Sequence, residues 1–311
     1  MNNSGFVLLD KPSGMTSRAA GGRVARMFGA KTFGHLGTLD PMASGLLPIA
    51  LGQATKMIPY LESLAHACPQ HPEKEYIFSI VWGIRTDTGD VTGKVVERNK
   101  NIPAKEYVAA ACESLVGEIE QTPPAFSAVH INGRRAYELA RRGEEFDIPK
   151  RKVNIYGLRV VLPTESEETS MFQVRCGAGT YVRSLALDIA EKCGTIATCA
   201  GIRRTRTGGF DIKDAVSLDF LENLYNNSPV EAREHLRPAD FGLDGIPVLE
   251  LNENDAKSFR NGSFVQIAVG SEQLAGKADG SLLRAYSENN FIGIGEIEDF
   301  VLKPKRIIID G

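Results

Sequence analysis

The chain has 311 residues, of which 42% are hydrophobic and 24% charged, and its formal net charge is −3. This length suits one large domain or two ordinary ones, and the composition excludes a disordered chain. No apolar run approaches the roughly 20 residues that span a bilayer, and the N-terminus lacks the basic-then-apolar layout of a signal peptide. We therefore expect a cytoplasmic protein with no membrane partner.

The first 60 residues predict two short elements and then an unusual loop. Residues 6–10 predict a short strand that ends in a Lys-Pro-Ser-Gly turn, and residues 17–28 predict a helix that Gly29 stops. The stretch 34–56 holds four glycines and a single acid, Asp40, followed by an apolar run typical of a buried strand. An acid at the edge of such a segment suits a cleft that a substrate backbone approaches closely. The alternative is that Asp40 and the proline after it form only a turn.

The rest of the chain predicts a mixture of strands and helices. In chain order these are a strand at 76–84, a turn at 86–90, a strand at 91–97, a helix from Pro103 to about Leu115, a proline-rich loop at 121–135, a basic helix at 136–143, strands at 152–162 and 171–176, and a helix capped by Thr180 that ends at Gly194. Strict strand–helix alternation is absent, which predicts an α+β fold with a mixed, largely antiparallel sheet and flanking helices. After about residue 240, short strands with Gly and Asn turns predict a small C-terminal β domain, joined by an acidic connector.

The charges are unevenly distributed along the chain. Residues 1–60 hold six Lys or Arg against two acids, residues 130–160 hold eight against four, and residues 215–255 hold two Arg against nine acids. A local basic surface is what phosphate contacts require, even where the net charge is negative. An ordinary solvated surface is the alternative that charge alone favours.

Cofactor and metal sites have little support. The five cysteines contain no C-x-x-C pair, so a disulfide framework or zinc ribbon is not expected. His66, Cys68 and His71 lie close together, but no fourth ligand of suitable spacing follows, which favours a polar loop. The stretch 29–32 imitates the end of a phosphate-binding loop, but Val24 stands where its first glycine should be. We expect no ATP, no NAD and no metal.

Two further segments are candidates for binding. Residues 176–190 place two glycines before a helix start, with Tyr181 and Arg183 in its first turn, where phosphates and carboxylates bind well. A capped helix with a solvated arginine is an equal alternative. Residues 200–210 hold three arginines in four positions, which fits either a phosphate-contacting strand or plain surface.

Four motifs resemble, in the same order, those of the TruB-type tRNA pseudouridine synthases of the bacterial stand-alone kind. They are DKPSGMTS (10–17), GHLGTLDPMASGLLP (34–48), KEYIFSIVWGIRTDTGD (74–90), and GTYVRSLALDIA (179–190) with IRRTRTGGF (202–210). The resemblance spans about residues 5–210, and the motif around Asp40 is highly specific. The chain departs from the family at Ile202, where leucine is usual, and in a longer spacer at 62–73.

The resemblance implies a domain organisation and an activity. It implies a pseudouridine synthase domain over 1–240, with an RNA-binding, thumb-like segment at about 121–150, and a PUA-like RNA-binding domain over 241–311. The implied reaction isomerises uridine 55 in the T-loop of tRNA to pseudouridine. It needs no redox change and no energy input, in keeping with the absence of cofactor motifs. A monomer without an obligate protein partner is implied.

The family's motifs also imply roles for individual residues. Asp40 would be the nucleophile or charge stabiliser, and Arg183 would pair with it and keep it ionised. Tyr76 would stack on the target base and take part in proton transfer. The other implied roles are a hold on the flipped nucleotide for Tyr181, a pocket wall for Ile202, occupation of the space that the base leaves for His35, and phosphate contacts for Arg134, Arg135, Arg141 and Arg142.

Two other functions compete with this interpretation. One is an RNA clamp or tRNA-folding factor of the same fold without essential chemistry, for which the basic stretches and the β domain suffice. The other is a guide-RNA-dependent synthase of the archaeal and eukaryotic kind. The complete motif around Asp40 favours an enzyme, and the short acidic C-terminal region favours a stand-alone one. The chemical path stays open between attack on the sugar carbon, attack on the base ring, and elimination to a glycal.

Overall fold

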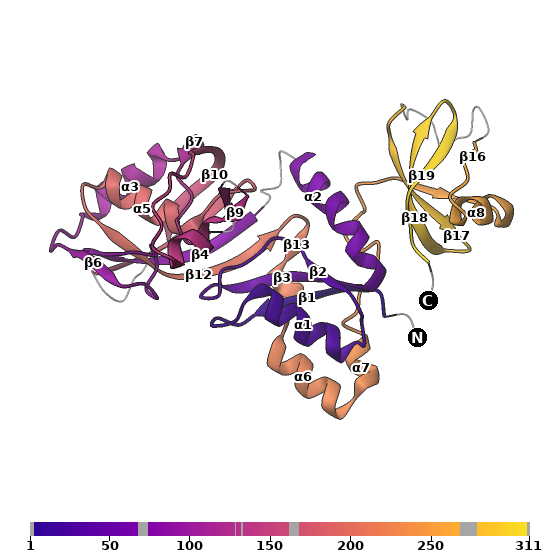
Figure 1. Ribbon diagram of the computed structural model, residues 1–311, viewed down its shortest axis with the longest axis horizontal. Coiled ribbons are helices and arrows are strands. Elements are labelled where there is room, and N and C mark those ends of the chain that lie inside the picture. Colours follow the sequence, from indigo (N-terminus) through magenta and orange to yellow (C-terminus); the bar gives the residue numbers. More distant parts are fainter. Residues whose placement is uncertain are drawn as a thin grey trace.

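The structure, a computed structural model, describes residues 3–67, 74–127, 129–131, 133–161, 168–267 and 279–309. A long mixed sheet with flanking helices forms the larger part, and a separate β domain lies at the C-terminal end (Figure 1). The predicted α+β class, the mixed and largely antiparallel sheet, and the small C-terminal β domain are therefore confirmed. In the described ranges, no helix is both long and apolar enough to cross a membrane.

The large sheet has the strand order β14-β1-β3-β12-β4-β11-β10-β7, with β2 paired to β3 and β13 paired to β12. The pairings of β1 with β14 and of β12 with β3 are parallel, and the other pairings are antiparallel. The strands are β1 (Gly5–Lys11), β2 (Phe33–His35), β3 (Ser44–Leu51), β4 (Lys74–Trp82), β7 (Gly117–Gln121), β10 (Arg151–Val161), β11 (Thr169–Cys176), β12 (Ala197–Thr207), β13 (Phe210–Asp211) and β14 (Val216–Ser217).

Helices flank both halves of this sheet, and short elements extend from it. Helices α6 and α7 lie next to α1 in one half, and α3 and α5 lie together in the other (Figure 1). The helices are α1 (Ser17–Met27), α2 (Ile58–Ala67), α3 (Lys105–Ser114), α4 (Ala136–Arg141), α5 (Val182–Lys192), α6 (Leu218–Asn227) and α7 (Pro229–Arg233), with 3-10 turns η1 (Gly52–Met57) and η2 (Ile212–Asp214). Two small hairpins pair β5 (Ile84–Thr86) with β6 (Val95–Arg98), and β8 (His130–Ile131) with β9 (Arg134–Arg135).

The first elements form where local signals predicted them. Strand β1 matches the apolar run at 6–10, and the buried run after Asp40 is β3. Helix α1 begins after Thr16, whose side chain accepts a hydrogen bond from the backbone N–H of Ala19, as an N-cap should. It ends before Gly29, which has a φ of 65° that glycine adopts without strain.

Three local predictions outside the candidate site were wrong. Helix α3 begins at Lys105 with Ala104 as its N-cap, so Pro103 precedes the helix and does not open it. The strand predicted at 91–97 is confined to β6, because the N–H of Asp87 bonds to the carbonyl of Lys94 and closes the turn between them. The acidic stretch is more than a connector, since its first part forms α6 and α7.

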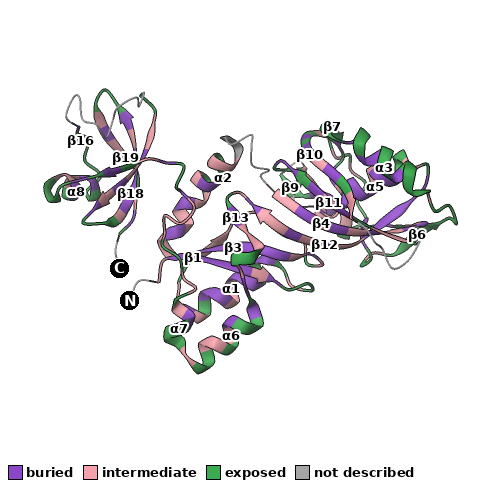
Figure 2. Cartoon of the chain, turned by 180° about the vertical axis from the view of Figure 1, so that it is seen from behind, coloured by how far each residue is buried: buried purple, intermediate pink, exposed green. Residues whose placement is uncertain are grey.

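The packing of α6 and α7 explains why that stretch is structured. Leu218, Leu221 and Ala232 are buried in the same core as Val24 of α1 and Phe28, the C-cap residue of that helix. Burial of apolar side chains on one helix face outweighs the repulsion among acids that remain on the solvent side. Figure 2 shows this division, with exposed residues on the outer faces of α6 and of α3 and buried residues along the central strands.

The C-terminal domain is a five-stranded sheet of order β15-β17-β18-β19-β16 with one helix, α8 (Glu253–Arg260). Its strands are β15 (Val248–Glu250), β16 (Val265–Gln266), β17 (Leu282–Ser287), β18 (Asn290–Glu298) and β19 (Val301–Ile307). A second apolar cluster joins it to the large sheet, since Ile294 and Ile308 pack with Leu61 of α2. Lys56 also donates to the carbonyl of Ile307 at 2.9 Å. The domain is therefore attached through the α2 side of the molecule.

Candidate active site

The loop that carries Asp40 connects β2 to β3 and is held in place by the start of α1. The hydroxyl of Ser17 donates to the carbonyl of Leu39 at 3.0 Å, and the N–H of Leu39 donates back to it at 2.8 Å. The N–H of Gly14 donates to the carbonyl of Pro41 at 2.8 Å. The Lys-Pro-Ser-Gly turn and α1 thus fix the backbone on both sides of Asp40, whose side chain is 38% exposed. The acid is both a turn residue and a cleft residue.

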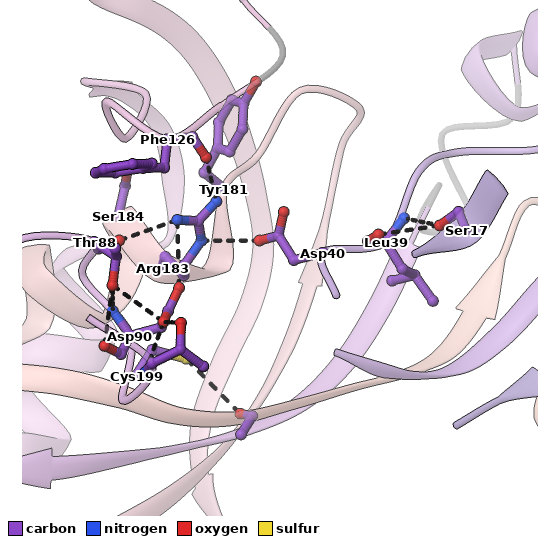
Figure 3. Close-up of polar contacts among 12 residues, drawn as sticks. Ser17, Leu39, Asp40, Thr88, Asp90, Phe126, Tyr181, Arg183, Ser184 and Cys199 are labelled. Carbon is purple, nitrogen blue, oxygen red and sulfur yellow. Dashed lines mark hydrogen bonds and ion pairs between the residues drawn. The ribbon is translucent and has the colours of Figure 1, made fainter. Parts of the chain in front are cut away.

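Arg183 joins this loop to two other segments of the chain (Figure 3). Its side chain is 4% exposed, and its Nε donates to Asp40 Oδ2 at 2.8 Å. Nη1 donates to the carbonyl of Thr88 at 3.0 Å, and Nη2 donates to the carbonyl of Phe126 at 2.8 Å. The contact between Arg183 and Asp40 that the resemblance implied is therefore present, and the alternative of a solvated arginine is wrong.

A second carboxylate, to which the sequence assigned no role, completes this network. Asp90 Oδ2 lies 3.5 Å from Arg183 Nη1, and the Asp90 side chain is only 6% exposed. Its Oδ1 accepts hydrogen bonds from the N–H of Thr92 at 3.0 Å and from the hydroxyl of Thr88 at 3.1 Å. The turn residues Thr-Asp-Thr-Gly-Asp form this cradle. The available signal was the acidic turn in the third motif.

Asp40 lines a cavity of about 200 Å³. The cavity brings together Asp40, Tyr76, Tyr181 and Ile202, four of the residues that the sequence singled out. Arg183 is not in the lining and lies behind Asp40. The remaining lining residues are Thr38, Leu39, Ala43, Lys74, Ser127, Gly179, Thr180 and Val182. The site is therefore a pocket with apolar and aromatic walls and one carboxylate.

Tyr76 lies on β4, and its ring is buried in the core that lines the pocket. Burial raises the pKa of the Tyr76 hydroxyl to about 12, although the neighbouring Arg204 guanidinium acts in the opposite direction. The hydroxyl is thus protonated at neutral pH and is available as a hydrogen-bond donor.

Tyr181 is the N-cap residue of α5, which corrects the prediction for Thr180. The side chain of Thr180 donates to the carbonyl of Gly177 at 3.0 Å and so does not cap the helix. The N–H of Tyr181 donates to Gln121 Oε1 at 2.7 Å, and the Arg151 guanidinium lies 5.8 Å from the Tyr181 ring centre. The Tyr181 side chain is therefore held at the pocket by its backbone and by a cation–π contact.

His35 lies outside the pocket lining. Its Nε2 is 3.1 Å from the hydroxyl of Thr38, which does line the pocket. Burial and the nearby Arg204 both lower the pKa of the His35 ring, so the neutral form predominates at pH 7. The structure thus places His35 next to a residue of the pocket lining and not in the lining itself.

The four arginines predicted to contact RNA lie on the segment around α4. Arg134 and Arg135 are exposed on β9, and Arg134 forms an ion pair with Glu144 at 3.2 Å. Arg142 lies 3.8 Å from the same carboxylate, and Arg141 packs 5.5 Å from the ring centre of Tyr137. Such exposed pairs contribute at most about 1 kcal/mol each.

The base of that segment is tied to the pocket through residues that the sequence did not reveal. Gln121 is fully buried, accepts from the N–H of Tyr181, and donates to Asp188 at 3.3 Å. The hydroxyl of Ser184 donates to the carbonyl of Thr122 at 2.7 Å. These contacts join positions 60 to 70 residues apart, so no local sequence pattern predicts them.

The arginine-rich strand matches its predicted surface form at Arg203 and Arg206, and departs from it at Arg204. Arg203 forms a two-pronged ion pair with Asp10 at 2.7 and 3.0 Å, and Arg206 lies 3.4 Å from Asp211. Arg204 is completely buried. It is therefore neither surface nor a phosphate contact. Arg206, two residues further along, is partly exposed, and the pairing of β12 with β4 shifts register between the two positions.

Among the residues that the structure describes, no group of three or more His, Cys, Asp or Glu side chains is arranged to hold a metal ion. Cys68 and His71 of the candidate cluster lie outside the described residues.

Comparisons with solved structures define the class of fold. The protein in "Crystal Structure of a Cbf5-Nop10-Gar1 Complex" matches with a TM-score of 0.68 and 21% identity, over 98% of this chain and 85% of that one. A chain in "Structure of H/ACA RNP bound to a substrate RNA containing 2'-deoxyuridine" matches with a TM-score of 0.66 and 19% identity, over 99% and 86%. At these identities the likeness is one of fold.

Sequence comparisons define the family. Residues 25–182 match the model for the TruB family pseudouridylate synthase N-terminal domain, residues 183–244 match a tRNA pseudouridylate synthase B C-terminal domain, and residues 247–308 match a pseudouridine synthase II TruB C-terminal domain. The chain belongs to the TruB family of pseudouridylate synthases.

Named relatives agree along nearly the whole length. The tRNA pseudouridine synthase B of Caulobacter vibrioides is 44% identical over 264 residues, which are 84% of this chain and 81% of that protein. The protein of the same name from Chelativorans sp. is 38% identical over 310 residues, which are 98% and 95% of the two chains.

Proposed function

We propose that this protein isomerises uridine 55 in the T-loop of tRNA to pseudouridine, with Asp40 as the reacting carboxylate and without a cofactor. The observation that carries the proposal is a carboxylate at the wall of an aromatic pocket, held by a buried arginine. Family membership supports the class of reaction, and relatives named tRNA pseudouridine synthase B support tRNA as the substrate.

The reaction breaks the N-glycosidic bond of uridine and forms a carbon–carbon bond from C5 of the base to the same sugar carbon. The C5 proton is lost, and a nitrogen of the base gains one, so the product is an isomer and no oxidant is consumed. Asp40 has one oxygen bonded to Arg183, and its partial exposure leaves carboxylate surface at the pocket. A positioned carboxylate of this kind acts as a nucleophile or stabilises developing positive charge.

The pocket walls suit a single flipped-out nucleotide. Tyr76 and Tyr181 provide aromatic faces, Ile202 provides an apolar wall, and the protonated Tyr76 hydroxyl is suited to proton transfer at the base. His35, next to a residue of the pocket lining, is suited to fill the space that the flipped base leaves in the loop. Flipping costs a few kcal/mol, which phosphate contacts from Arg134, Arg135, Arg141 and Arg142 would offset.

We further propose that the protein acts in the cytoplasm as a monomer and needs neither a guide RNA nor a protein partner. In this scheme residues 1–240 form the catalytic domain, with a thumb-like segment at about 121–150, and residues 241–311 form a PUA-like RNA-binding domain.

The test replaces Asp40 with asparagine, which keeps the size and removes the charge. Purified protein, with no guide RNA, is mixed with a T-stem-loop transcript labelled with tritium at uridine C5, and tritium release is followed. We expect wild type to release tritium from position 55 and Asp40→Asn to be slower by several orders of magnitude, with RNA binding kept. Asp211→Asn is the matched control, because that acid ends β13, pairs with Arg206 and is absent from the pocket lining.

Three outcomes would contradict the proposal in different ways. Turnover by Asp40→Asn within about tenfold of wild type would remove Asp40 from the chemistry. Tight RNA binding by wild type without tritium release would favour an RNA clamp or folding factor. Release only after a guide RNA is added would favour the guide-dependent class.

A further inference from the structure

Arg204 is the largest side chain that the fold buries completely, and it lies next to the proposed active site. An ion in the protein interior loses several kcal/mol of hydration, so its retention requires specific partners. Its partners are backbone carbonyl groups of the loop that carries Asp40. Nη2 donates to Gly37 O at 3.0 Å and to Leu36 O at 3.3 Å, while Nε donates to Leu46 O at 2.8 Å.

These carbonyl groups lie on both sides of Asp40 in the chain. Leu36 and Gly37 precede it, and Leu46 follows it in β3. One rigid, planar guanidinium therefore clamps the two ends of the loop together. A flexible lysine, with a single nitrogen, lacks the geometry to reach the same three carbonyls.

Two glycines of the motif lie against residue 204, Gly37 against its side chain and Gly45 against its backbone. Gly37 has a φ of 69°, and a Cβ added there would lie 2.9 Å from Arg204 Nη1. Gly45 has a φ of 102°, and its added Cβ would lie 2.3 Å from the Arg204 carbonyl oxygen. Both contacts are too close for a side chain, so the loop and Arg204 fit only with glycine at these positions.

Arg204 also adjoins Tyr76. On β12 it is paired with Tyr76 of β4 on one side and with Gly45 of β3 on the other. The Tyr76 hydroxyl lies beside the guanidinium, whose charge lowers the pKa of that hydroxyl against the larger effect of burial. Arg204 thus contacts the elements that carry both Asp40 and Tyr76 without lining the pocket itself.

We infer that Arg204 is a positioning residue, which fixes the loop of Asp40 through three backbone carbonyls and supports Tyr76 from the facing position on β12. The inference rests on the proposed function for its catalytic consequence. Its structural part, the clamp on residues 36–46, does not depend on that function.

The experiment compares Arg204→Lys and Arg204→Met with the control Arg206→Met. Arg206 lies on the same strand, but it is partly exposed and contacts Asp211. Single-turnover conversion at saturating enzyme should fall about 10- to 100-fold in Arg204→Lys, since displacement of reacting groups by about 1 Å costs rate of this order. The dissociation constant for T-stem-loop RNA should stay within about threefold of wild type, and Arg206→Met should match wild type in rate.

Two further readouts separate positioning from general damage. Hydrogen exchange without RNA should be faster at residues 36–46 in Arg204→Lys and unchanged in Arg206→Met, and this readout survives a failure of the proposed function. In a Tyr76→Phe background, Arg204→Lys should lose less rate than in wild type, because part of its effect acts through the hydroxyl.

Three contrary results would each refute one component of this role of Arg204. A wild-type rate in Arg204→Lys refutes the positioning role, even if Arg204→Met does not fold. Unchanged exchange at residues 36–46 refutes the clamp. Equal rate losses in the two backgrounds remove Tyr76 from the inference.

Discussion

The Arg183 network permits a sharp test of stability, because it joins one partly exposed carboxylate to one buried carboxylate. Arg183→Met removes the cation and keeps much of the side-chain length. Asp90, at 6% exposure, would then be a buried charge without its cation. The carbonyl groups of Thr88 and Phe126 would lose a charged donor as well.

The expected size of the effect follows from these contacts. Removal of one partner from a buried ion pair costs about 3–5 kcal/mol. Asp90→Asn alone leaves Arg183 bonded to Asp40 and should cost only about 1–2 kcal/mol. The double variant has no buried unpaired charge, so it should recover about 1–3 kcal/mol of the sum of the two single effects.

Urea unfolding followed by tryptophan fluorescence measures these free energies. The chain has a single tryptophan, Trp82, which is buried on β4 and donates to the Ser170 hydroxyl at 2.9 Å. Arg203→Met is the control, because its pair with Asp10 is partly exposed and should contribute at most about 1 kcal/mol. If the losses in unfolding free energy of Arg183→Met and Asp90→Asn add up to that of the double variant within about 0.5 kcal/mol, the two residues are not coupled.

Three other predictions concern the pocket, the RNA surface and pH. Tyr76→Phe should lose at least about 100-fold in single-turnover rate if the hydroxyl moves a proton, and Tyr76→Leu should lose more; a Phe variant as fast as wild type would leave Tyr76 as a stacking platform only. Reversal of Arg141 and Arg142 to Glu should weaken tRNA binding and flatten its dependence on salt, whereas an unchanged salt slope would move the RNA footprint elsewhere. Burial raises the pKa of Asp188 from 3.8 to about 6, so the native state holds more protons than the unfolded state between these values. Stability should therefore fall as pH rises from about 4 to about 6, and Asp188→Asn, which can still accept from Gln121, should remove this decline and be more stable than wild type at pH 7 by about 1–2 kcal/mol. Parallel pH profiles of the two proteins in urea unfolding would contradict this assignment.

Local signals in the sequence predicted most of the elements that position the site. The cap of α1, the buried run of β3 and the glycine that ends α5 all depend on neighbouring residues, and the fold leaves them in place. The same kind of reasoning failed at Thr180. The residue is well chosen for an N-cap, but its hydroxyl bonds backwards to Gly177, and Gln121 from a distant strand satisfies the N–H of Tyr181 instead. A tertiary contact there replaced a local one.

The sequence predicted most of the residues that form the site, but few of the contacts that join them. Asp40 and Arg183 were paired through the resemblance, and the structure places them 2.8 Å apart. Asp90 was visible only as an acid in a turn, since the approach of that turn to α5 depends on contacts across about 95 residues. The charge pattern did not predict that Arg204 is buried, because three arginines in four positions do not indicate the face of the strand on which each side chain lies. Alternation alone would place Arg204 and Arg206 on the same face of the strand. The register shift between them and the pairing of β12 with β3 place Arg204 against the glycine loop.

The start of α5 is where these parts of the site converge. Tyr181 lines the pocket, Arg183 bonds to Asp40 from behind, and Ser184 bonds to the carbonyl of Thr122 at the base of the basic segment. Arg183 itself bonds to the carbonyl of Phe126 in that segment. A displacement of residues 121–127 would therefore remove a partner from Arg183 and change its hold on Asp40. The contacts that position the carboxylate and the contacts that hold the basic segment both come from residues 181–184, about one helical turn, so the two sets of contacts are mechanically linked.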